Sequence, residues 1–349
     1  MAVTRSFTNG YEVVEYTKQI ENIAPTWNYF NSSNLFDITP VSQDTIIFDK
    51  SVTTNTLLPQ VSTRSRESVK EKSDTYQPYA LILPHFKDSL DIVPEDLKGF
   101  RQANTADGAE QLASVRLKKL ERIRSNVDQT VEYMKLQSVK GITKSPDGKT
   151  VANMFTEFGV TQPVVTFNFA VPAFDVRVAI SLLQDTAAEN LTTGGTITNL
   201  NVMVSKEFFA GLTSHPQTVQ AFQYQQGSTY FRDGDTKYGQ FATTRRFDFM
   251  GVSFFTYNAT FNLPNGTKER AIAAQEGHVI AEGISDLYRG YWGSSDKLHG
   301  VNQMGREVFV YEYPDLKDER YELQYEFKHL YFITQPLMAI KVVNTNIAP

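Results

Sequence analysis

The residues that could carry out chemistry do not form an active-site motif. The segment nearest to a phosphate-binding loop, GxxxxGK[ST], begins at Gly141 and ends in Gly148-Lys149-Thr150, but six residues separate the two glycines instead of four. The sequence also contains no GxGxxG after a predicted strand, no GxSxG and no HExxH. We therefore expect a protein that is not an enzyme and that has no cofactor.

Metal-ligating residue types are present but scattered. Asp233 and Asp235 flank a glycine without the later ligands of a calcium loop, so a polar turn is expected there. No two histidines have the i, i+4 spacing that places both on one helix face. His329 lies in phase with the apolar residues of a predicted strand and is expected to pack in the core. The five histidines are His85, His215, His278, His299 and His329.

Composition excludes several classes of protein. The 349 residues are 41% hydrophobic and 21% charged, an ordinary globular composition in a chain long enough to bury a core. The absence of cysteine excludes disulfides and thiolate zinc sites. A formal net charge of −5 argues against wrapping nucleic acid by bulk charge. No signal-peptide pattern and no run of roughly 18 apolar residues is found, so we expect a soluble protein made in the cytoplasm, without membrane contact.

The clearest predicted element is a long amphipathic helix over 106–141, with Thr105 as candidate N-cap and Gly141 as its stop. Basic residues such as Arg116 and Arg124 alternate with acidic ones such as Glu121, which is typical of a solvated helix face rather than a nucleic-acid surface. The apolar residues recur at steps that average close to 3.6. They are Leu112, Val115, Leu120, Ile123, Val127, Val131 and Met134.

The chain before this helix predicts an arm and a projecting loop. Residues 1–44 mix aromatic residues with Asn, Ser and Pro without a period, as in an arm that packs on another surface. The strand-like TIIF and ALIL segments flank a charged, turn-rich stretch, which indicates a long hairpin within 45–98. Its mixed charges suit contact with another protein chain, and equally a merely soluble loop. They include Arg64, Arg66, Lys70 and Glu71.

Strands and helices follow the long helix without a βαβ rhythm, so the predicted fold class is α+β. Residues 320–328 alternate apolar and polar side chains strictly, which predicts a strand with one buried face. An apolar run over 337–343 predicts a last strand. Further strands are expected over 164–169, 201–204 and 252–257, and helices over 173–189 and 206–212.

Short motifs spread over nearly the whole chain carry a resemblance to a known family. The arm contains PTWNYF at 25–30, the loop RSR at 64–66 and YQPY at 76–79. The helix ends in EYM at 132–134 and leaves through LQSVKG. Further matching segments are TFNF at 166–169, NVMVSKEFF at 201–209, RYELQY at 320–325 and TQPLM at 334–338.

In this order the motifs resemble the capsid protein E family, the major capsid proteins of lambda-type tailed phages. The stretch 227–262 and the Asn-rich tail have no counterpart in the family pattern. The resemblance implies the tailed-phage major capsid fold. Its expected parts are an N-terminal arm (1–44), an extended loop (45–98), a peripheral domain (99–170 and 309–349) with the spine helix (106–141), and an axial domain (171–308).

The resemblance also implies a structural role, self-assembly into the pentamers and hexamers of an icosahedral head around double-stranded DNA. Implied partners are further copies of the chain, scaffolding, portal and decoration proteins, and packaged DNA held without sequence specificity. The implied location is the virion, after assembly in the host cytoplasm. Alternatives are a tail tube or decoration protein, or a carbohydrate- or peptide-binding module. The candidate inter-subunit contacts are Trp27, Phe30, Arg64, Arg66, Lys70 and Glu71.

Overall fold

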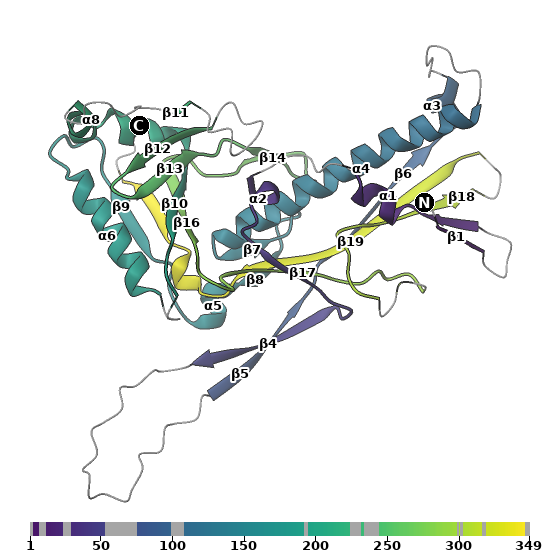
Figure 1. Cartoon of the computed structure of the whole chain (residues 1–349), viewed down its shortest axis with the longest axis horizontal. Helices are drawn as coiled ribbons and strands as arrows, with labels where there is room; N and C mark the ends of the chain where they lie inside the picture. Colours follow the sequence, from purple (N-terminus) through teal and green to yellow (C-terminus); the bar gives the residue numbers. More distant parts are fainter. Residues whose placement is uncertain are drawn as a thin grey trace, which may run out of the picture.

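The computed structural model describes residues 3–6, 12–23, 29–52, 75–98, 108–191, 195–223, 232–233, 244–298, 300, 303–315 and 319–345. Within these residues the fold is α+β, as predicted. Two sheets lie toward opposite ends of the molecule, and one long helix and one long strand run along its length (Figure 1). A two-stranded ribbon projects away from this body (Figure 1).

The first sheet is built around β19 (Tyr321–Ile333). β6 (His85–Ile92) pairs with it antiparallel from Lys328↔His85 to Tyr321↔Ile92. The strand order among described residues is β1-β2-β18-β19-β17-β3, with β6 also on β19. The other members are β1 (Val3–Ser6), β2 (Glu12–Glu15), β3 (Asp37–Pro40), β17 (Tyr288–Trp292) and β18 (Phe309–Pro314).

The prediction of a single buried face on β19 is correct only at its start. Leu323 and Tyr325 are buried while Gln324 between them is half-buried, but from Glu326 to Ile333 every residue is buried. The cause is tertiary, because the long helix α4 (Gly108–Val139) packs against β19 and the 293–298 segment also contacts it. Alternation of apolar and polar residues therefore indicates a strand with one covered face. On β19 the second face is also covered, which buries the charged side chains of Glu326 and Lys328.

The spine helix α4 (Gly108–Val139) follows the predicted apolar stripe and spans on the order of 48 Å. Leu120, Ile123 and Val127 are buried on its inner side. The helix ends as predicted, because Gly141 has φ +85° and its amide donates to the Ser138 carbonyl at 2.9 Å. A side chain there would also meet the ring of Phe155. The proposed N-cap Thr105 lies outside the described residues.

The second sheet has the order β11-β12-β13-β10-β16-β20-β9. Ser205 caps helix α7 through the Phe208 amide at 3.3 Å, as expected for a strand-to-helix step. The strands are β9 (Val164–Phe167), β10 (Asn199–Val204), β11 (Arg232–Asp233), β12 (Arg245–Phe249), β13 (Val252–Thr256), β16 (Glu276–Glu282) and β20 (Lys341–Asn344). The helices near it are α6 (Val176–Glu189), α7 (Lys206–Ser214) and α8 (Pro216–Gln223).

The last predicted strand is wrong in its first half. Pro336–Met338 forms a 3-10 helix, and β20 begins at Lys341. Pro336 has no amide hydrogen to give to a sheet, and the Met338 amide donates to the Gln335 carbonyl at 3.0 Å.

The smaller elements are α3 (Pro94–Lys98), α5 (Met154–Phe158), and the hairpins β7 (Ile142–Lys144) with β8 (Thr150–Asn153) and β14 (Thr260–Asn262) with β15 (Lys268–Arg270).

Sheet membership differs from the expected domain limits. β17 lies inside the predicted axial segment 171–308 yet pairs with β19 of the first sheet. β9 and β20 lie inside the predicted peripheral segments yet join the second sheet. β6 lies inside the predicted loop 45–98 but is a strand of the first sheet, so the projecting ribbon is shorter than expected. Each crossing depends on a long-range strand pair that composition along the chain does not reveal.

Candidate functional site

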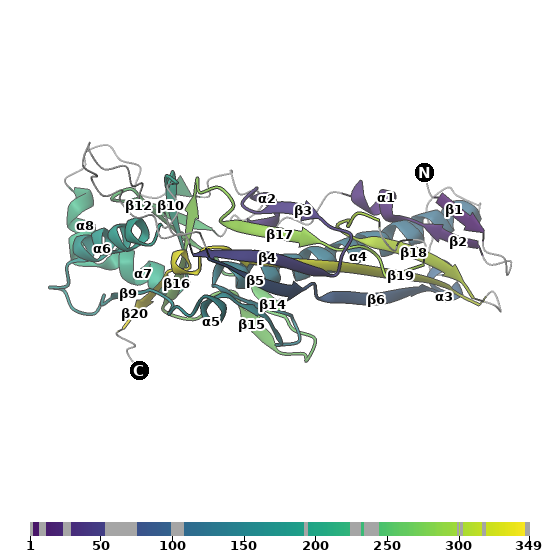
Figure 2. The same ribbon diagram turned by 90° about the horizontal axis from the view of Figure 1, so that it is seen from below.

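The projecting ribbon consists of β4 (Thr45–Val52) and β5 (Thr75–Ile82), paired antiparallel along their whole length (Figure 1, Figure 2). This confirms the predicted hairpin flanks. Ile46 and Leu81 lie opposite each other and are buried. Strand alternation places Ile47 and Ile82 on the other face, where each is 69% exposed. The predicted contact residues of the tip, Arg64, Arg66, Lys70 and Glu71, lie outside the described residues.

A buried lysine holds the base of the ribbon. Lys328 on β19 places its Nζ 2.6 Å from Asp44 Oδ1, directly before β4, and also contacts Asp296. The Lys328 side chain is 5% exposed, whereas the two carboxylates are half exposed. Burial disfavours the ammonium charge, but hydrogen bonds to Asp296 and Asp44 outweigh it and raise the pKa of Lys328. The lysine therefore stays charged and ties the ribbon to β19.

The same contacts continue through Glu326, which is buried on β19 beside Lys328. Its carboxylate accepts hydrogen bonds from the Ser295 hydroxyl and, at 3.2 Å, from the Asp296 amide. His85, the first residue of β6, lies 3.3 Å from both Glu326 and Asp296. We call Asp44, His85, Asp296, Glu326 and Lys328 the ribbon anchor.

The ribbon anchor holds a histidine and carboxylates beside Ser295, but it is not a nucleophile site. A Ser-His-acid triad requires the histidine to take the proton of the serine hydroxyl. Here the Ser295 hydroxyl donates to Glu326, and the two ring nitrogens of His85 face Asp296 and Glu326. The arrangement can fix the strands that meet there and has no activated hydroxyl.

The arm residues do not present the aromatic surface that the sequence suggested. Trp27 lies outside the described residues. Phe30 is 0% exposed and packs edge-on against Tyr29, Phe36 and Tyr257 of its own chain. Phe30 is therefore withdrawn as an inter-subunit contact. The reason is that α2 (Tyr29–Ser32) docks on α4, while the preceding α1 (Thr17–Glu21) docks on α4 and β18.

One carboxylate joins the arm to both halves of the molecule. Glu132 on α4 is 0% exposed and accepts hydrogen bonds from the amides of Phe30 and Asn31, each at 3.0 Å. It also accepts one from the hydroxyl of Tyr257, which follows β13, at 2.7 Å. Lys135, one turn further along α4, reaches the side-chain oxygen of Asn31 at 2.9 Å. Burial raises the pKa of Glu132 to about 7, although these hydrogen bonds and Lys135 oppose the shift.

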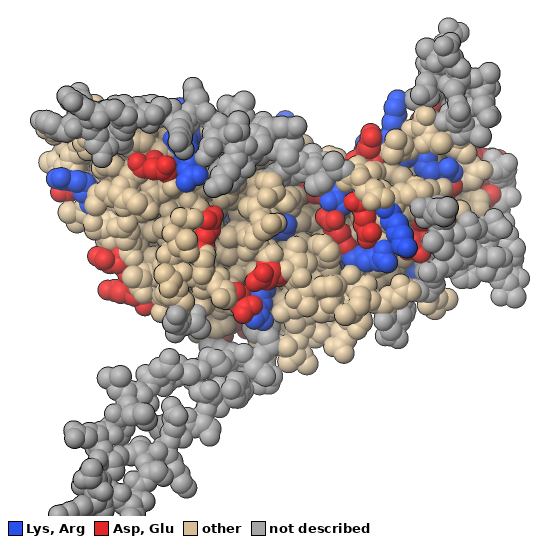
Figure 3. All heavy atoms as spheres, in the orientation of Figure 1, with Lys and Arg blue, Asp and Glu red and all other residues tan. Residues whose placement is uncertain are grey.

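The charged residues of α4 are solvated only in part. Lys118 and Glu121 are exposed as predicted. Arg116 and Arg124 instead form two-pronged pairs with carboxylates of the segment around β18. The distances are 2.6 and 2.7 Å from Arg116 to Glu312, and 2.8 and 2.9 Å from Arg124 to Glu307. On the face drawn in Figure 3 basic and acidic side chains lie side by side, without a continuous basic field.

Histidines and acidic residues do not gather into a metal site in the described part of the chain. His329 is buried as predicted, stacks on Trp292, and contacts the hydroxyl of Tyr331 at 3.3 Å. Burial lowers the pKa of His329 to about 3, so the ring is neutral. His299 and Asp235 lie outside the described residues. In the described part, no helix has the length and apolarity needed to cross a bilayer.

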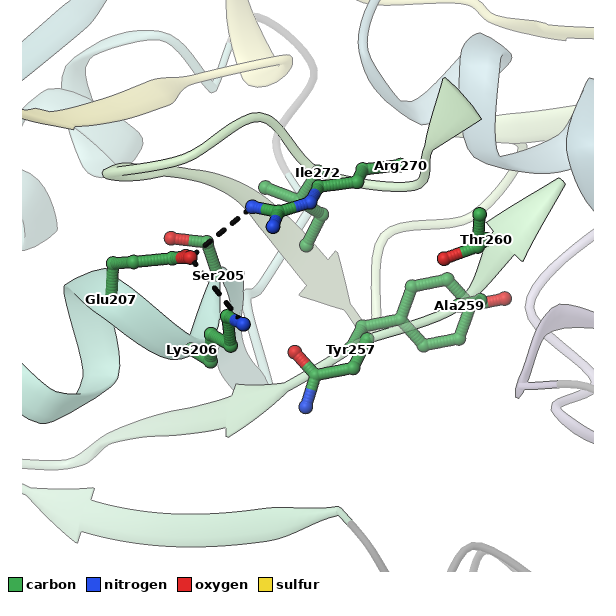
Figure 4. A pocket seen from close by; sticks show the side chains of 9 residues that line it. Ser205, Lys206, Glu207, Tyr257, Ala259, Thr260, Arg270 and Ile272 are labelled. Atoms are coloured by element: carbon green, nitrogen blue, oxygen red, sulfur yellow. Dashed lines mark hydrogen bonds and ion pairs between the residues drawn. The ribbon is translucent and has the colours of Figure 1, made fainter. Parts of the chain in front are cut away.

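A polar pocket lies between α7 and the β14–β15 hairpin (Figure 4). Glu207 Oε1 lies 3.2 Å from the Arg270 guanidinium and 3.9 Å from Lys206 Nζ (Figure 4). Tyr257 forms part of the wall. Glu207 forms ion pairs with both cations of the pocket, Arg270 and Lys206. The pocket therefore links α7 to the β14–β15 hairpin and presents no reactive group among the described residues.

Two parts of this arrangement were missed from the sequence, the ribbon anchor and the Glu132 cluster. Glu326 and Lys328 had a detectable signal, since they are charged residues next to a continuous apolar run on the same strand. Glu132 had none, because its partners Phe30 and Tyr257 lie 102 and 125 residues away.

Comparison with known proteins gives a consistent result along the whole chain. Residues 12–344 match the family model described as phage major capsid protein E. The chain is 25% identical over 361 residues to the major capsid protein of Salmonella phage Felix O1, covering 97% of this chain and 98% of that protein. It is 27% identical over 344 residues to the major capsid protein of Pseudomonas phage KPP10, with 96% and 97% covered.

Solved structures agree at the level of the fold. A putative capsid protein of a prophage of E. coli CFT073 superimposes with a TM-score of 0.61 over 99% of this chain and 100% of that one, at 11% identity. A capsid subunit of cyanophage A-1(L) gives a TM-score of 0.50 over 94% and 95%, at 10% identity. These likenesses show a tailed-phage capsid fold, with mixed helices and sheets.

Proposed function

Because the chain belongs to the phage major capsid protein E family, we propose that its copies close into pentamers and hexamers with the β4–β5 ribbon of each subunit laid on its neighbour. The protein is a structural capsid protein and not an enzyme. Rings of this kind use heterologous contacts, in which one surface meets a different surface of the next copy. A ribbon that leaves its own body is suited to such a contact.

The observation that supports this proposal is the exposed apolar face of the ribbon. An isolated two-stranded ribbon is at best marginally stable in water and needs a partner for its apolar side chains. Ile47 and Ile82 are both on the outer face and 69% exposed, while Ile46 and Leu81 on the opposite face are buried. Covering them on assembly gains roughly 25 cal/mol for each Å² of apolar surface removed from water.

The remaining contacts are proposed from the sequence. Trp27 of the arm and the tip residues Arg64, Arg66, Lys70 and Glu71 contact neighbouring subunits. Scaffolding, portal and decoration proteins bind the assembling shell, which forms in the host cytoplasm, and packaged DNA lies against the inner face without sequence-specific contacts. The modest net charge of −5 is compatible with a wall that does not condense onto DNA.

The double variant Ile47→Ser, Ile82→Ser tests the ribbon contact. We expect unchanged circular dichroism of the subunit, because both side chains are already exposed, and a strong loss of particles counted by negative-stain microscopy. The matched control is Ala80→Ser, which lies on the same exposed face opposite Ile47 but removes no large apolar group. Normal particle numbers from the double variant would contradict the contact.

The tip is tested by reversing charge in Arg64→Glu, Arg66→Glu. A like-charge contact costs several kcal/mol at each repeated interface, whereas surface changes alter subunit stability by about 0.5 kcal/mol or less. Assembly should fail at low salt and partly recover at high salt, because salt screens exposed charges. Shells that form normally at low salt would show that these arginines make no important contact.

A further inference from the structure

A recess with an excess of positive charge lies where α4 ends, and residues of β7, of the β14–β15 hairpin and of the neighbouring strands β16 and β20 line it. It has a volume of about 470 Å³. Five cationic side chains line it against two carboxylates, those of Glu269 and Glu276. The cations are Lys140, Lys144, Lys268, Arg270 and Lys341.

The two carboxylates offset this positive charge only in part, and each already has a partner. Glu276 is paired with Lys341 at 2.6 Å, and Glu269 accepts a hydrogen bond from the Tyr133 hydroxyl at 3.1 Å. Arg270 is directed to Glu207 of the neighbouring pocket, at 3.2 Å.

Three lysines therefore remain without an ion pair in the described part of the chain. Lys144 and Lys268 are exposed at the rim. Lys140 is only half-buried as a residue, but its Nζ reaches inward and donates to the Ala271 carbonyl at 2.6 Å. These ammonium groups have no carboxylate within 4.0 Å among the described residues, so their charges are available to a ligand.

A second, independent observation concerns His278, which lines the same recess and is 5% exposed. Its Nδ1 is buried and has no hydrogen-bond partner in the described part of the chain. Leaving such a group unpaired costs on the order of 1–3 kcal/mol. Burial and the nearby charges of Lys140 and Lys341 lower the pKa of His278, so the ring is neutral and one of its two nitrogens carries a hydrogen that can form a hydrogen bond to a bound oxygen.

We infer that this recess binds a phosphate group. A tetrahedral oxyanion placed among Lys140, Lys144 and Lys268 would pair with charges that now have no carboxylate, and one of its oxygens would accept a hydrogen bond from His278. Lysine ammonium groups bind phosphate as point charges and need no planar geometry. The phosphate has two possible sources, the free ion and the backbone of nucleic acid. The recess is complete within one subunit, so the inference does not depend on assembly.

The test is titration of the full-length chain with inorganic phosphate by isothermal calorimetry, beside the variant Lys144→Ala, Lys268→Ala. Both lysines are exposed, so the fold should be unchanged, and we expect phosphate affinity to fall at least tenfold. The control is Lys149→Ala, which removes an exposed lysine that is paired with Asp147 outside the recess and should leave the affinity unchanged. No phosphate binding by the unmodified chain would overturn the inference, as would an equal loss in both variants.

The source of the phosphate is separated by competition with a short DNA duplex. Displacement of phosphate by DNA in the unmodified chain, and not in the double variant, would support backbone phosphate as the ligand. Phosphate binding that DNA leaves unchanged would support the free ion.

The role of His278 is tested by two substitutions. His278→Gln, which retains a donor of similar reach, should keep phosphate binding, whereas His278→Leu should weaken it. Both variants should unfold at similar denaturant concentrations. Equal affinity of these two variants would remove His278 from the site.

Discussion

At the scale of single residues, the buried Glu132 carboxylate makes three hydrogen bonds to segments far away in the sequence. It accepts two amide hydrogens of the arm and the Tyr257 hydroxyl of the second sheet. Each of these donors would be buried and unpaired without it, and an unpaired buried donor costs more than a hydrogen bond gains. The carboxylate therefore fixes the arm and the second sheet against one point of α4.

Removing one of these donors has a measurable cost. Tyr257→Phe keeps the buried ring but deletes the hydroxyl that lies 2.7 Å from Glu132. Above the Glu132 pKa of about 7 the carboxylate is charged, and hydrogen bonds to charged groups contribute about 1.5–3 kcal/mol. The free energy of unfolding should therefore fall by that amount in urea denaturation at mildly alkaline pH. Tyr313→Phe, a half-buried tyrosine beside Lys297, is the control and should unfold near the original midpoint. Equal midpoints for both variants would show that the Glu132 bond is not stabilising.

The buried carboxyl also gives stability a distinct pH dependence. Burial raises the pKa of Glu132 from 4.5 to about 7 in the folded chain. Between these values the unfolded chain has lost the proton that the folded chain retains, so the Glu132 contribution to the free energy of unfolding falls as pH rises from 4.5 to 7. The total fall is about 3 kcal/mol.

Glu132→Gln isolates this effect, because glutamine does not titrate and the other carboxyl groups are common to both chains. The free energy of unfolding of the original chain minus that of the variant should fall by about 3 kcal/mol as the pH rises from 4.5 to about 7. Denaturant unfolding at several pH values measures it. A difference that stays constant with pH would show that the carboxyl ionises at its ordinary value.

At the scale of elements, α4 has one buried side and one exposed side, and aliphatic residues occur on both. Ile123 is 0% exposed and Leu117 is 51% exposed on the same helix. Ile123→Ala should lower the free energy of unfolding by about 2–5 kcal/mol through lost burial and the cavity left behind. Leu117→Ala, a matched aliphatic truncation, should change it by about 0.5 kcal/mol or less. Similar losses in both variants would mean that the helix is packed on both sides.

The elements that could be predicted are those whose signal is local. The apolar stripe of α4 and its glycine stop are repeated or adjacent in sequence, and the structure confirms them. The partners of each strand were not predictable, because β3, β6 and β17 join β19 from segments far apart in the chain. For the same reason the ribbon was recognised while the ribbon anchor that holds it was not.

Although strand pairing could not be predicted, the order of short motifs along the chain was sufficient to identify the family. Individual motifs such as NVMVSKEFF are weak, but their succession along the chain identified the fold class and the capsid role that the comparisons show. The domain limits stay a prediction, and strands of each sheet come from segments on both sides of those limits. Burial of Phe30 was also unpredictable, because its surroundings come from α4, from Phe36 directly before β3 and from Tyr257 directly after β13.

At the scale of the whole molecule, the arm is a structural part of its own subunit. Deleting residues 1–28 keeps α2 on α4, whereas deleting residues 1–33 also removes the buried Phe30 and both amides that bind Glu132. The longer deletion should lower the free energy of unfolding by about 3–5 kcal/mol more than the shorter one, the usual effect of losing a buried phenylalanine. Urea denaturation of the two truncated chains compares them directly. Matching midpoints would show that α2 contributes only to assembly.

The pairing of β6 with β19 determines how the subunit carries mechanical tension. A pull on the ribbon reaches β6 at His85, and the eight residue pairs from Lys328↔His85 to Tyr321↔Ile92 connect β6 to β19. When the ribbon is pulled against the opposite end of β19, this ladder is loaded in shear, so its hydrogen bonds resist together instead of opening one after another. Optical-tweezer handles on the ribbon and at Arg320 should record a single high-force rupture, and a staircase of small steps would indicate peeling. We therefore expect force applied to the ribbon to be shared by the whole β6–β19 ladder and carried into the first sheet of the subunit.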